Sequence, residues 1–338
     1  MNHPLEQNNS SPNAAPLLTV EQLSRHFPLG GNLWGKPHRW VKAVDGVSFA
    51  LNRGETLALV GESGCGKTTT GRMVLRLIPP TAGRVLLEGT DLSGLSARDL
   101  VPHRRRMQMI FQDPYASLNP RMTAGAMVEE PLAIHRIGTP AERKDRVAAL
   151  FQRVGLRPDQ RTMYPHQFSG GQRQRVGIAR ALALDPALIV ADEPVSALDV
   201  SIQAQVVNLL AGLQAERGMA YLFISHDLAV VRHLAHRVAV MYLGRLAELA
   251  PREELFSRPR HPYTQALLAA VPSADPAVAP RRTGLPRTLL GGEVPDPANA
   301  PPGCAFHPRC PLAREHCRGT PPPWREIQPA HWAACHEI

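Results

Sequence analysis

The sequence has no stretch of about 20 consecutive apolar residues, the length that a membrane-spanning helix needs. Its most apolar segment, residues 181–191, is interrupted by Asp185 and Pro186. Residues 1–16 lack the apolar core of a signal peptide and are rich in Asn, Pro and Ser, so we expect a disordered leader there. We therefore expect a soluble, intracellular protein, in which any membrane role comes from partner chains.

Basic blocks and aromatic residues are also scarce. The net charge is +9, but there is no block of six like charges and no basic helix, and aromatic residues make up only 5%. The densest basic cluster, Arg104–Arg106, runs directly into the apolar Met107–Phe111, which favours a solvated entry to a strand or helix over a nucleic-acid patch. A hydrophobic content of 43% is sufficient for a sizeable core. At ~150 residues per domain, the length suggests about two domains.

A phosphate-binding loop is the strongest motif in the chain. Residues 61–68 match the pattern G-x-x-x-x-G-K-[ST] without substitution, between a predicted strand at Thr56–Val60 and a predicted helix at Lys67–Leu77. Glycines let the backbone wrap a phosphate closely, and N–H groups at a helix start point at its oxygens. Lys67 would then reach the β- and γ-phosphates, and the Thr68 hydroxyl would take one position on Mg²⁺.

Eight residues of this motif are the candidate contacts to the nucleotide: Gly61, Ser63, Gly64, Cys65, Gly66, Lys67, Thr68 and Thr69. Cys65 stands at a variable position of the pattern. A small neutral residue is the preferred interpretation there, with a redox-sensitive brake on ATP binding as the alternative.

The surrounding segments predict an α/β fold with a helical insertion. Further strands are predicted at Leu17–His26, Val41–Leu51, Gly83–Glu88 and Met107–Phe111. Residues 28–40 are rich in Gly and Pro and indicate a hairpin loop between the first two strands. Helical periodicity, as in Arg143–Val154, dominates residues 118–180, so we expect an inserted helical subdomain there.

Ser169-Gly170-Gly171-Gln172 opens a long helix predicted at Gln172–Leu184. Two glycines at a helix start leave N–H groups accessible near the positive end of the helix dipole. The stretch therefore predicts a second anion-binding site.

Two carboxylates end the apolar strand predicted at Leu188–Glu193. Burying unpaired charge is costly, so this pair needs a cation and a proton to act on. Asp192 would hold the water shell of Mg²⁺, and Glu193 would polarise an attacking water. A helix at Val200–Glu216 and a strand at Met219–Ile224 are predicted next. The strand leads to His226, for which a γ-phosphate contact is the preferred interpretation.

Together these motifs resemble the nucleotide-binding subunit of ATP-binding cassette (ABC) transporters, over residues 17–250. Phe168 departs mildly from the Leu that is more frequent in the family before Ser-Gly-Gly-Gln. The resemblance implies an α/β P-loop NTPase cassette with a RecA-like core, an antiparallel β subdomain and an inserted α-helical subdomain. By position, Phe27 matches the aromatic residue that stacks on adenine. Gln112 matches the residue that contacts Mg²⁺ and senses the membrane partner, and Asp199 matches an acidic residue of the dimer interface.

The resemblance also implies partners. Two such cassettes face head to tail, so that ATP lies between one chain's phosphate loop and the other chain's Ser-Gly-Gly-Gln, and we expect a heterodimer with a second ATPase subunit. Two membrane permease subunits would bind this pair, and a substrate-binding protein would act through them. The chain would lie peripherally on the cytoplasmic face of the inner membrane.

The C-terminal segment, residues 251–338, contains 17 of the 33 prolines. This density predicts an irregular extension with one short helix at His261–Ala270. The stretch His-Pro-Tyr-Thr-Gln-Ala-Leu-Leu in that helix resembles the oligopeptide/dipeptide import branch of the family, in particular the second ATPase subunit of bacterial dipeptide importers. The implied cargo is a di- or oligopeptide. Related systems that import nickel chelates, glutathione or sugars are the alternatives.

Four of the five cysteines lie in this extension: Cys304, Cys310, Cys317 and Cys335. Disulfides are unusual in a cytoplasmic protein, whereas a proline-rich segment with little core gains from a metal. Four thiolates suit zinc or an iron–sulfur cluster. The C-x₂-C pair that usually marks a zinc ribbon does not occur, so the spacing favours neither strongly. Four histidines could replace a cysteine: His307, His316, His331 and His336. The resemblance favours a [4Fe–4S] cluster, with zinc and metal-free thiols as alternatives.

An ATPase that acts on nucleic acid is the competing function, suggested by the positive charge alone. ABC proteins of repair and translation carry inserted coiled coils, inserted zinc modules or two cassettes, whereas this chain has one cassette and no heptad run. We therefore expect a transport ATPase without a nucleic-acid partner.

Overall fold

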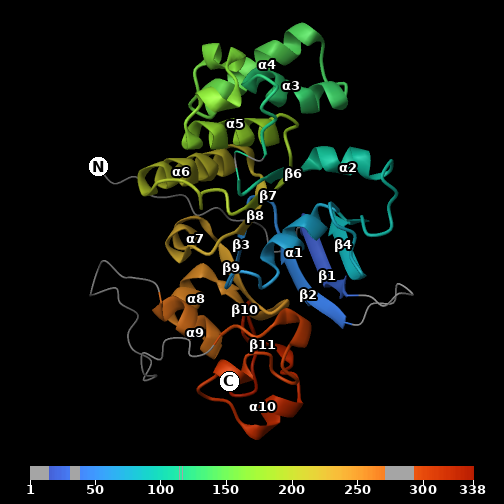
Figure 1. Ribbon diagram of the computed structural model, residues 1–338, viewed down its shortest axis with the longest axis vertical. Coiled ribbons are helices and arrows are strands. Elements are labelled where there is room, and N and C mark those ends of the chain that lie inside the picture. Colours follow the sequence, from blue (N-terminus) through green and yellow to red (C-terminus); the bar gives the residue numbers. More distant parts are fainter. Residues whose placement is uncertain (1–14, 31–38, 114, 116, 271–292) are drawn as a thin grey trace.

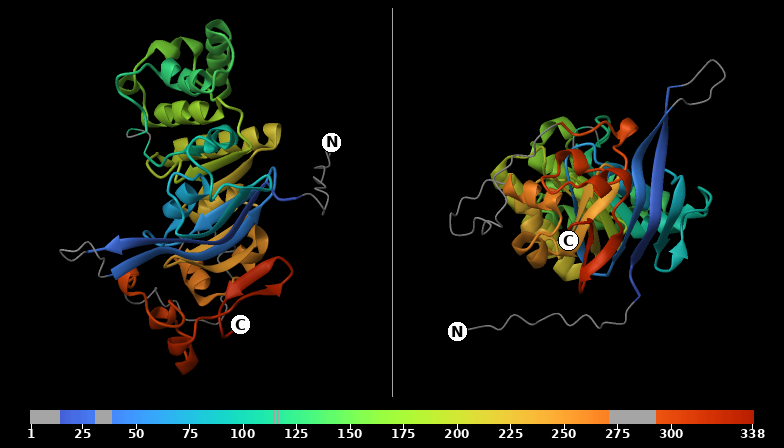
Figure 2. Two further views of the ribbon diagram at one scale, coloured as in Figure 1. Left: turned by 90° about the vertical axis from the view of Figure 1, so that its right-hand side faces the viewer. Right: turned by 90° about the horizontal axis from the view of Figure 1, so that it is seen from below.

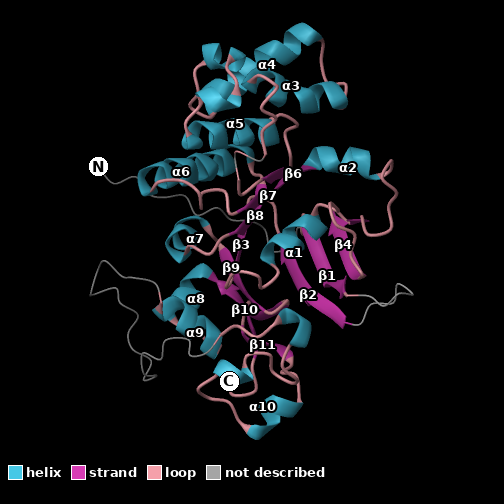
Figure 3. Cartoon of the chain, viewed as in Figure 1, coloured by secondary structure: helices cyan, strands magenta, loops and turns pink. Residues whose placement is uncertain are grey.

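The computed structural model describes residues 15–30, 39–113, 115, 117–270 and 293–338. The predicted leader and the tip of the predicted hairpin loop lie mostly outside these residues. Within them, the chain forms an eight-stranded sheet, a four-stranded sheet and a group of helices beyond one edge of the larger sheet (Figure 1). Figure 3 shows the same arrangement by element type.

Five adjacent strands of the larger sheet run parallel, in the order β9 (Arg237–Tyr242), β3 (Thr56–Val60), β8 (Ala220–Ile224), β7 (Leu188–Asp192) and β6 (Met107–Ile110). Every residue of β3, β7 and β8 is buried, which explains their continuous apolar character. Alternate side chains of β3 pack into different hydrophobic cores. Ala58 and Val60 pack into one cluster, and Leu57 and Leu59 pack into the other, because successive side chains of a strand point to opposite faces.

The smaller sheet is antiparallel, with the order β2 (Arg39–Leu51), β1 (Leu18–Leu29), β4 (Ala82–Leu87) and β5 (Thr90–Asp91). β1 and β2 pair as far as Leu29 and Arg39, which both lie inside the loop predicted at residues 28–40. The left view of Figure 2 shows this long ribbon crossing the body of the molecule. Both strands extend beyond the predicted bounds, since each supplies the other with backbone partners toward the loop.

The helical insertion lies at one end of the molecule (Figures 1 and 2). It contains three helices and two 3₁₀ turns: α3 (Ala124–Ile134), α4 (Pro140–Arg153), η1 (Pro158–Thr162), η2 (Pro165–Gln167) and α5 (Gly170–Leu182). Capping boxes begin α4 at Thr139 and α5 at Ser169, where the cap hydroxyl and a side chain three residues later satisfy each other's backbone N–H groups. The cap explains why α5 begins at Gly170 and not at the predicted Gln172.

Six further helices flank the sheets: α1 (Lys67–Val74), α2 (Leu100–Arg106), α6 (Val200–Arg217), α7 (Leu228–Leu234), α8 (Arg252–Ser257) and α9 (Pro262–Ala269). α1 ends before the predicted Leu77, and Arg76 follows it with φ +53°. Arg104–Arg106 form the last turn of α2, where cations interact favourably with the helix dipole. None of the described helices combines the length and the apolar character that crossing a membrane requires.

The C-terminal segment is more ordered than its proline content predicts. After β10 (Arg245–Pro251), the strands β11 (Trp324–Gln328) and β12 (His331–Ala334) form a hairpin that pairs with β10 and completes the larger sheet. Short elements precede it: η3 (Pro297–Asn299), η4 (His307–Arg309) and α10 (Glu315–Gly319). The prediction of an irregular extension is therefore wrong for this hairpin, which forms because β10 offers its edge as a pairing partner.

A buried glutamate attaches this segment to the core. Glu248 of β10 is 0% exposed and accepts hydrogen bonds from the backbone N–H groups of Arg260 (2.8 Å) and His261 (2.9 Å). The His331 ring, also 0% exposed, hydrogen-bonds the same carboxylate at 2.7 Å. One carboxylate thus joins β10, the segment before α9 and β12.

We predict that Glu248→Ala lowers the free energy of unfolding by about 3–5 kcal/mol, because it leaves buried donors without an acceptor. The shift of the thermal unfolding midpoint measures this. Glu253→Ala is the matched control, since that side chain is 79% exposed and its loss should cost less than about 0.5 kcal/mol. Equal midpoints for the two variants would contradict the role of Glu248.

Candidate active site

The phosphate-binding loop connects β3 to α1, and two of its glycines are required by close backbone approaches. A Cβ on Gly61 (φ +149°) would lie 2.2 Å from the Met241 carbonyl oxygen, and a Cβ on Gly66 (φ +106°) would lie 2.1 Å from the Ala43 carbonyl oxygen. Neither site can accept a side chain without moving backbone. The loop is therefore held against β9 and β2 by its glycines.

Lys67 lies inside the curve of the loop. Its ammonium group is buried and donates hydrogen bonds to the carbonyl oxygens of Gly61 (2.8 Å) and Glu62 (2.9 Å). Within the described residues, no backbone hydrogen bond uses the N–H groups of Ser63, Gly64 or Gly66. The loop thus combines a cation with unused N–H donors, which is the arrangement that binds a phosphate.

Cys65 packs into one of the two hydrophobic core clusters. Its side chain is buried, and its sulfur lies 3.8 Å from the Lys67 nitrogen. Burial raises the pKa of the thiol although the Lys67 charge acts in the opposite direction. A protonated, buried thiol is unreactive, which supports the interpretation of Cys65 as a small neutral residue.

Asp192, the last residue of β7, meets the start of α1. The Thr68 hydroxyl donates a hydrogen bond to the Asp192 carboxylate at 2.8 Å. Asp192 is 2% exposed, and this burial raises the pKa of its carboxyl group, although Thr68 and nearby cations oppose the rise. Together the two residues present oxygen ligands of the kind that Mg²⁺ prefers.

Two side chains, each just after the end of a strand next to β7, contact the Glu193 carboxylate. Gln112 follows β6, and its Nε2 donates a hydrogen bond to Glu193 Oε2 at 2.9 Å. His226 follows β8, and its Nδ1 lies 3.2 Å from the same oxygen. Glu193 has φ +44°, a conformation that non-glycine residues adopt at a cost, and its N–H donates to the Ile224 carbonyl oxygen at 2.9 Å. The structure thus brings the three predicted residues together.

The Ser169–Gln172 stretch does not join this group. Within the described residues, no hydrogen bond connects it to residues 61–68. Part of its donor capacity is used locally, since Ser169 Oγ accepts the Gln172 N–H at 3.3 Å. A Cβ on Gly171 would lie 2.5 Å from Ile202 Cγ2, so this glycine lets α5 pack closely on α6.

Two further residues are assigned to the site by the family resemblance alone. Phe27, in β1, is half-buried, and the Arg25 guanidinium lies over its ring at 4.6 Å from the centroid. Asp199 is exposed at the start of α6, beside Val200, which is 82% exposed.

The four C-terminal cysteines come together around one cavity, which His307 and His336 also line. Burial raises the pKa of the Cys304 and Cys335 thiols, and it raises that of Cys310 to about 11. Thiolates in this cavity therefore need a cation. Of these cysteines, only Cys317 belongs to a group of potential ligands whose atoms all lie within 4.8 Å, together with His316 and Glu337. Among the described residues, these three side chains are therefore close enough together to hold a single ion.

Three of the four candidate histidines, all except His316, have hydrogen-bond partners outside the group of Cys317, His316 and Glu337. His331 bonds to Glu248, as described above, and is not among the residues that line the cavity. His316 lies 2.9 Å from Glu337, and His307 and His336 bond to backbone oxygens at 2.9 Å.

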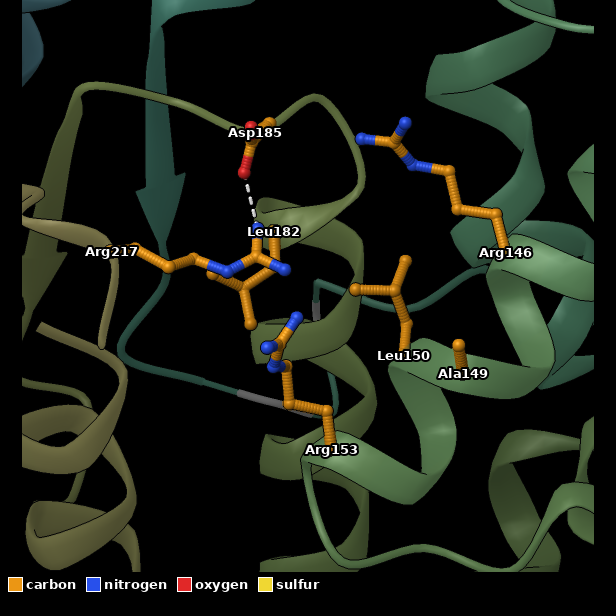
Figure 4. Close-up of a pocket in the computed structure, with 7 residues that line it drawn as sticks. All are labelled: Arg146, Ala149, Leu150, Arg153, Leu182, Asp185 and Arg217. Carbon is orange, nitrogen blue, oxygen red and sulfur yellow. Dashed lines mark hydrogen bonds and ion pairs between the residues drawn. The ribbon is translucent and has the colours of Figure 1, made fainter.

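A further cavity of about 320 Å³ lies away from these groups, between α4, α5 and the end of α6 (Figure 4). Two of its three arginines are paired, Arg217 with Asp185 and Arg153 with Glu216. Neither the phosphate-binding loop nor its partners line it, so we assign no nucleotide to it.

Comparisons with known proteins agree with this geometry. The family model described as ABC transporter matches residues 44–196, and the model for the oligopeptide/dipeptide transporter C-terminal region matches residues 247–317. Among solved structures, the dimeric post-hydrolysis ATP-binding cassette MJ0796 bound to ADP and Pi is 29% identical, with a TM-score of 0.63, and covers 70% of this chain and 98% of its own. The chain therefore belongs to the ATP-binding cassette proteins of ABC transporters.

Curated relatives narrow this class. The probable peptide ABC transporter ATP-binding protein y4tS of Sinorhizobium fredii (strain NBRC 101917 / NGR234) is 56% identical over 320 residues, which are 95% of this chain and 89% of the relative. The oligopeptide transport ATP-binding protein AppF of Bacillus subtilis (strain 168) is 53% identical over 325 residues, which are 96% of this chain and 98% of the relative. Within the class, the chain belongs to the family that contains these two ATP-binding proteins.

Three residues at the site carry no motif of their own: Glu62, Tyr263 and Arg309. Glu62 occupies a variable position of the loop, and its partners Tyr263 and Arg309 lie in the C-terminal segment. Tyr263 belongs to the predicted helix at 261–270, but no feature of the sequence indicates that it reaches the loop.

We predict that Gly66→Ala lowers the free energy of unfolding by on the order of 3–5 kcal/mol, because its Cβ would overlap backbone and its φ is positive. Gly64→Ala is the matched variant: φ is +78°, but nothing lies within 4 Å of the added Cβ. It should cost only about 1–2 kcal/mol. Thermal unfolding of both variants separates the two effects, and a Gly66→Ala variant as stable as Gly64→Ala would refute the steric account.

Proposed function

We propose that this chain is the ATP-hydrolysing subunit that powers import of di- or oligopeptides through a separate membrane permease. The observation that supports it most directly is the Glu193 carboxylate, held by Gln112 and His226 next to the Asp192–Thr68 pair. The cargo is proposed from the relatives, whose names specify peptide or oligopeptide transport.

ATP would bind first to this chain's loop. The unused N–H groups of the loop and the Lys67 ammonium would receive the phosphates, and Phe27 would stack on adenine. The proposed contact residues are Phe27, Gly61, Ser63, Gly64, Cys65, Gly66, Lys67, Thr68, Thr69, Gln112 and Asp192. In this role Lys67 exchanges loop carbonyls for phosphate oxygens.

Three oxygen donors would hold Mg²⁺: the Thr68 hydroxyl, the Asp192 carboxylate and the Gln112 amide oxygen. Gln112 Nε2 donates a hydrogen bond to Glu193, so the amide oxygen of Gln112 remains available to the metal. When bound, Mg²⁺ would neutralise charge on the β- and γ-phosphate oxygens.

Glu193 would accept the proton of the attacking water. Asp192 already accepts a hydrogen bond from the Thr68 hydroxyl, whereas Glu193 accepts one from the Gln112 amide and none from a hydroxyl. His226, which is 59% exposed, would contact the γ-phosphate and orient Glu193 through their 3.2 Å contact. The positive φ of Glu193 places its side chain between the ends of β6 and β8.

The second half of the site would come from another cassette. Ser169, Gly170, Gly171 and Gln172 lie apart from this chain's loop and would face the ATP of a partner, as a two-cassette arrangement requires. The dimeric MJ0796 structure supports such an assembly. We propose a heterodimer with a related ATPase subunit, bound to two permease subunits on the cytoplasmic face of the inner membrane and served by a substrate-binding protein.

The cysteine cavity would hold a [4Fe–4S] cluster on Cys304, Cys310, Cys317 and Cys335. Four thiols around one cavity are a donor set that such a cluster uses, and the family resemblance favours the cluster over Zn²⁺.

For the ATPase role, we expect Glu193→Gln to keep ATP binding and to lower kcat by about 10²–10⁴-fold, because the amide cannot accept the water's proton. Binding of labelled ATP and phosphate release in the assembled complex measure the two effects. Glu253→Gln, an exposed glutamate outside the site, should behave as the parent. Hydrolysis at the parental rate by Glu193→Gln would refute the general-base role.

For the metal, anaerobic purification should give about four iron and four sulfide per chain, with visible absorbance. Cys310→Ser should lower the iron content, whereas Cys65→Ser, outside the cavity, should leave it unchanged. A colourless protein with one zinc per chain would exclude the cluster.

A further inference from the structure

Glu62 is the residue of the phosphate-binding loop with the most partners. Its carbonyl oxygen accepts from Lys67 Nζ at 2.9 Å, and its N–H donates to the Tyr263 hydroxyl oxygen at 2.9 Å. Its carboxylate receives a two-pronged contact from Arg309, Nη1 to Oε2 at 2.7 Å and Nη2 to Oε1 at 2.9 Å. The Cys65 N–H also donates to the Glu62 carbonyl oxygen, at 3.3 Å. Two of the four partners, Tyr263 and Arg309, belong to the C-terminal segment, more than 200 residues along the chain.

The Arg309 side chain is buried, so its contact with Glu62 is not an exposed surface ion pair. Its side chain is only 4% exposed, against 23% for Glu62. The Glu62 carboxylate holds the pKa of the guanidinium above its usual range. A planar guanidinium that binds both oxygens of a carboxylate fixes orientation as well as distance. Arg309 therefore sets the position of the Glu62 side chain and neutralises its charge.

An aromatic cluster supports both contacts. The Tyr263 ring lies 4.7 Å from Tyr242 and 5.4 Å from Phe306, and Tyr242 and Phe306 lie 5.3 Å apart, all between centroids. Tyr263 is 0% exposed and Phe306 2%. The Arg309 guanidinium lies 5.9 Å from the Tyr242 ring. The cluster packs the C-terminal segment against the end of β9, beside the loop.

The same two backbone segments line the cysteine cavity. Cys310 lines it and immediately follows Arg309, and Pro262 lines it and immediately precedes Tyr263. Cys304 and Phe306 also line it. A movement of a residue that lines the cavity can therefore displace Arg309 or Tyr263, since each is bonded directly to such a residue.

We propose that Arg309 and Tyr263 are positioning residues through which the cysteine-rich segment controls the affinity of the phosphate-binding loop for ATP. The proposal rests on the ATPase function proposed above. It assigns to the C-terminal segment a role at the nucleotide site of the same chain.

The physical basis is charge and orientation. A carboxylate in a loop that binds a triphosphate opposes binding unless it is neutralised, and Arg309 supplies the opposite charge in a nearly dry setting. Tyr263 fixes the direction of the Glu62 peptide, and with it the N–H groups that follow. Glu193 and His226, which would act on the water, have no hydrogen bond to Arg309 within the described residues. The effect should therefore fall on ATP binding and not on kcat.

The first experiment measures the Kd of Mg²⁺-ATP for the full-length chain by calorimetry, and KM and kcat in the assembled complex. Arg309→Ala should raise Kd and KM by about tenfold and leave kcat within about twofold of the parent. Glu62→Gln in the Arg309→Ala background should restore most of the affinity, because it removes the uncompensated charge. Arg318→Ala, an exposed arginine of the same segment, is the matched control and should bind ATP as the parent does.

Rescue distinguishes a specific charge effect from damage to the fold. If Arg309→Ala is folded and binds ATP as tightly as the parent, or if Glu62→Gln makes its binding weaker still, the proposal is wrong. Should Arg309→Ala fail to fold, Arg309→Gln, which removes the charge but keeps a long polar side chain, provides the same comparison. If the parent chain itself does not bind Mg²⁺-ATP, it is the proposed function that fails.

A second arm tests the link to the cysteines with the same binding measurement. Cys310→Ser should raise the Kd of Mg²⁺-ATP when Arg309 is present, and it should have no further effect in the Arg309→Ala background. Cys317→Ser, on α10, changes another thiol of the same cavity and should likewise raise the Kd only when Arg309 is present. An equal effect of Cys310→Ser in both backgrounds would show that the cysteines act without Arg309, and would overturn the proposal.

Discussion

The hydrogen-bonded register of three parallel strands determines where the phosphate-binding loop, the two carboxylates and His226 lie. Leu59 of β3 pairs with Ile224 of β8, and Ile224 pairs in turn with Asp192 of β7. Because the carboxyl ends of parallel strands meet at one edge of a sheet, the phosphate-binding loop, Glu193 and His226 emerge together. A slip of one residue in either pairing would turn Asp192 to the opposite face and separate it from Thr68. The apolar residues that fill both faces of these strands specify the register, so the core and the site depend on the same packing.

Much of this site could be predicted because its signals are local. A glycine pattern between an apolar strand and a helix identifies a phosphate-binding loop, and two carboxylates at the end of a buried strand call for a cation. The contacts around Glu62 could not be predicted in this way. Tyr263 and Arg309 reach it from distant parts of the chain, and neither belongs to a pattern that specifies a partner. The capping box at Ser169 is again local, but the packing of Gly171 on Ile202 depends on how α5 and α6 meet.

The C-terminal segment shows where composition is a weak guide. Its prolines argue against regular structure, yet Trp324–Gln328 and His331–Ala334 contain none and pair as a hairpin on the edge of β10. Glu248 then joins this hairpin to the segment before α9, and the aromatic cluster around Tyr263 carries the connection to the loop. Local propensity could not reveal this, because the stabilising partners are the free edge of a sheet and one buried carboxylate. As a result, the proposed cluster site and the proposed ATP site share a common support.

The central claim is that this cassette converts ATP hydrolysis into peptide import. Its most direct test is reconstitution in lipid nanodiscs of this chain with a related ATPase subunit, two permease chains and their binding protein. The account predicts that the binding protein loaded with a di- or oligopeptide stimulates ATP hydrolysis, and that the empty binding protein does not. Failure of the chain to copurify with permease subunits, together with stimulation of its ATPase by duplex DNA, would contradict the account.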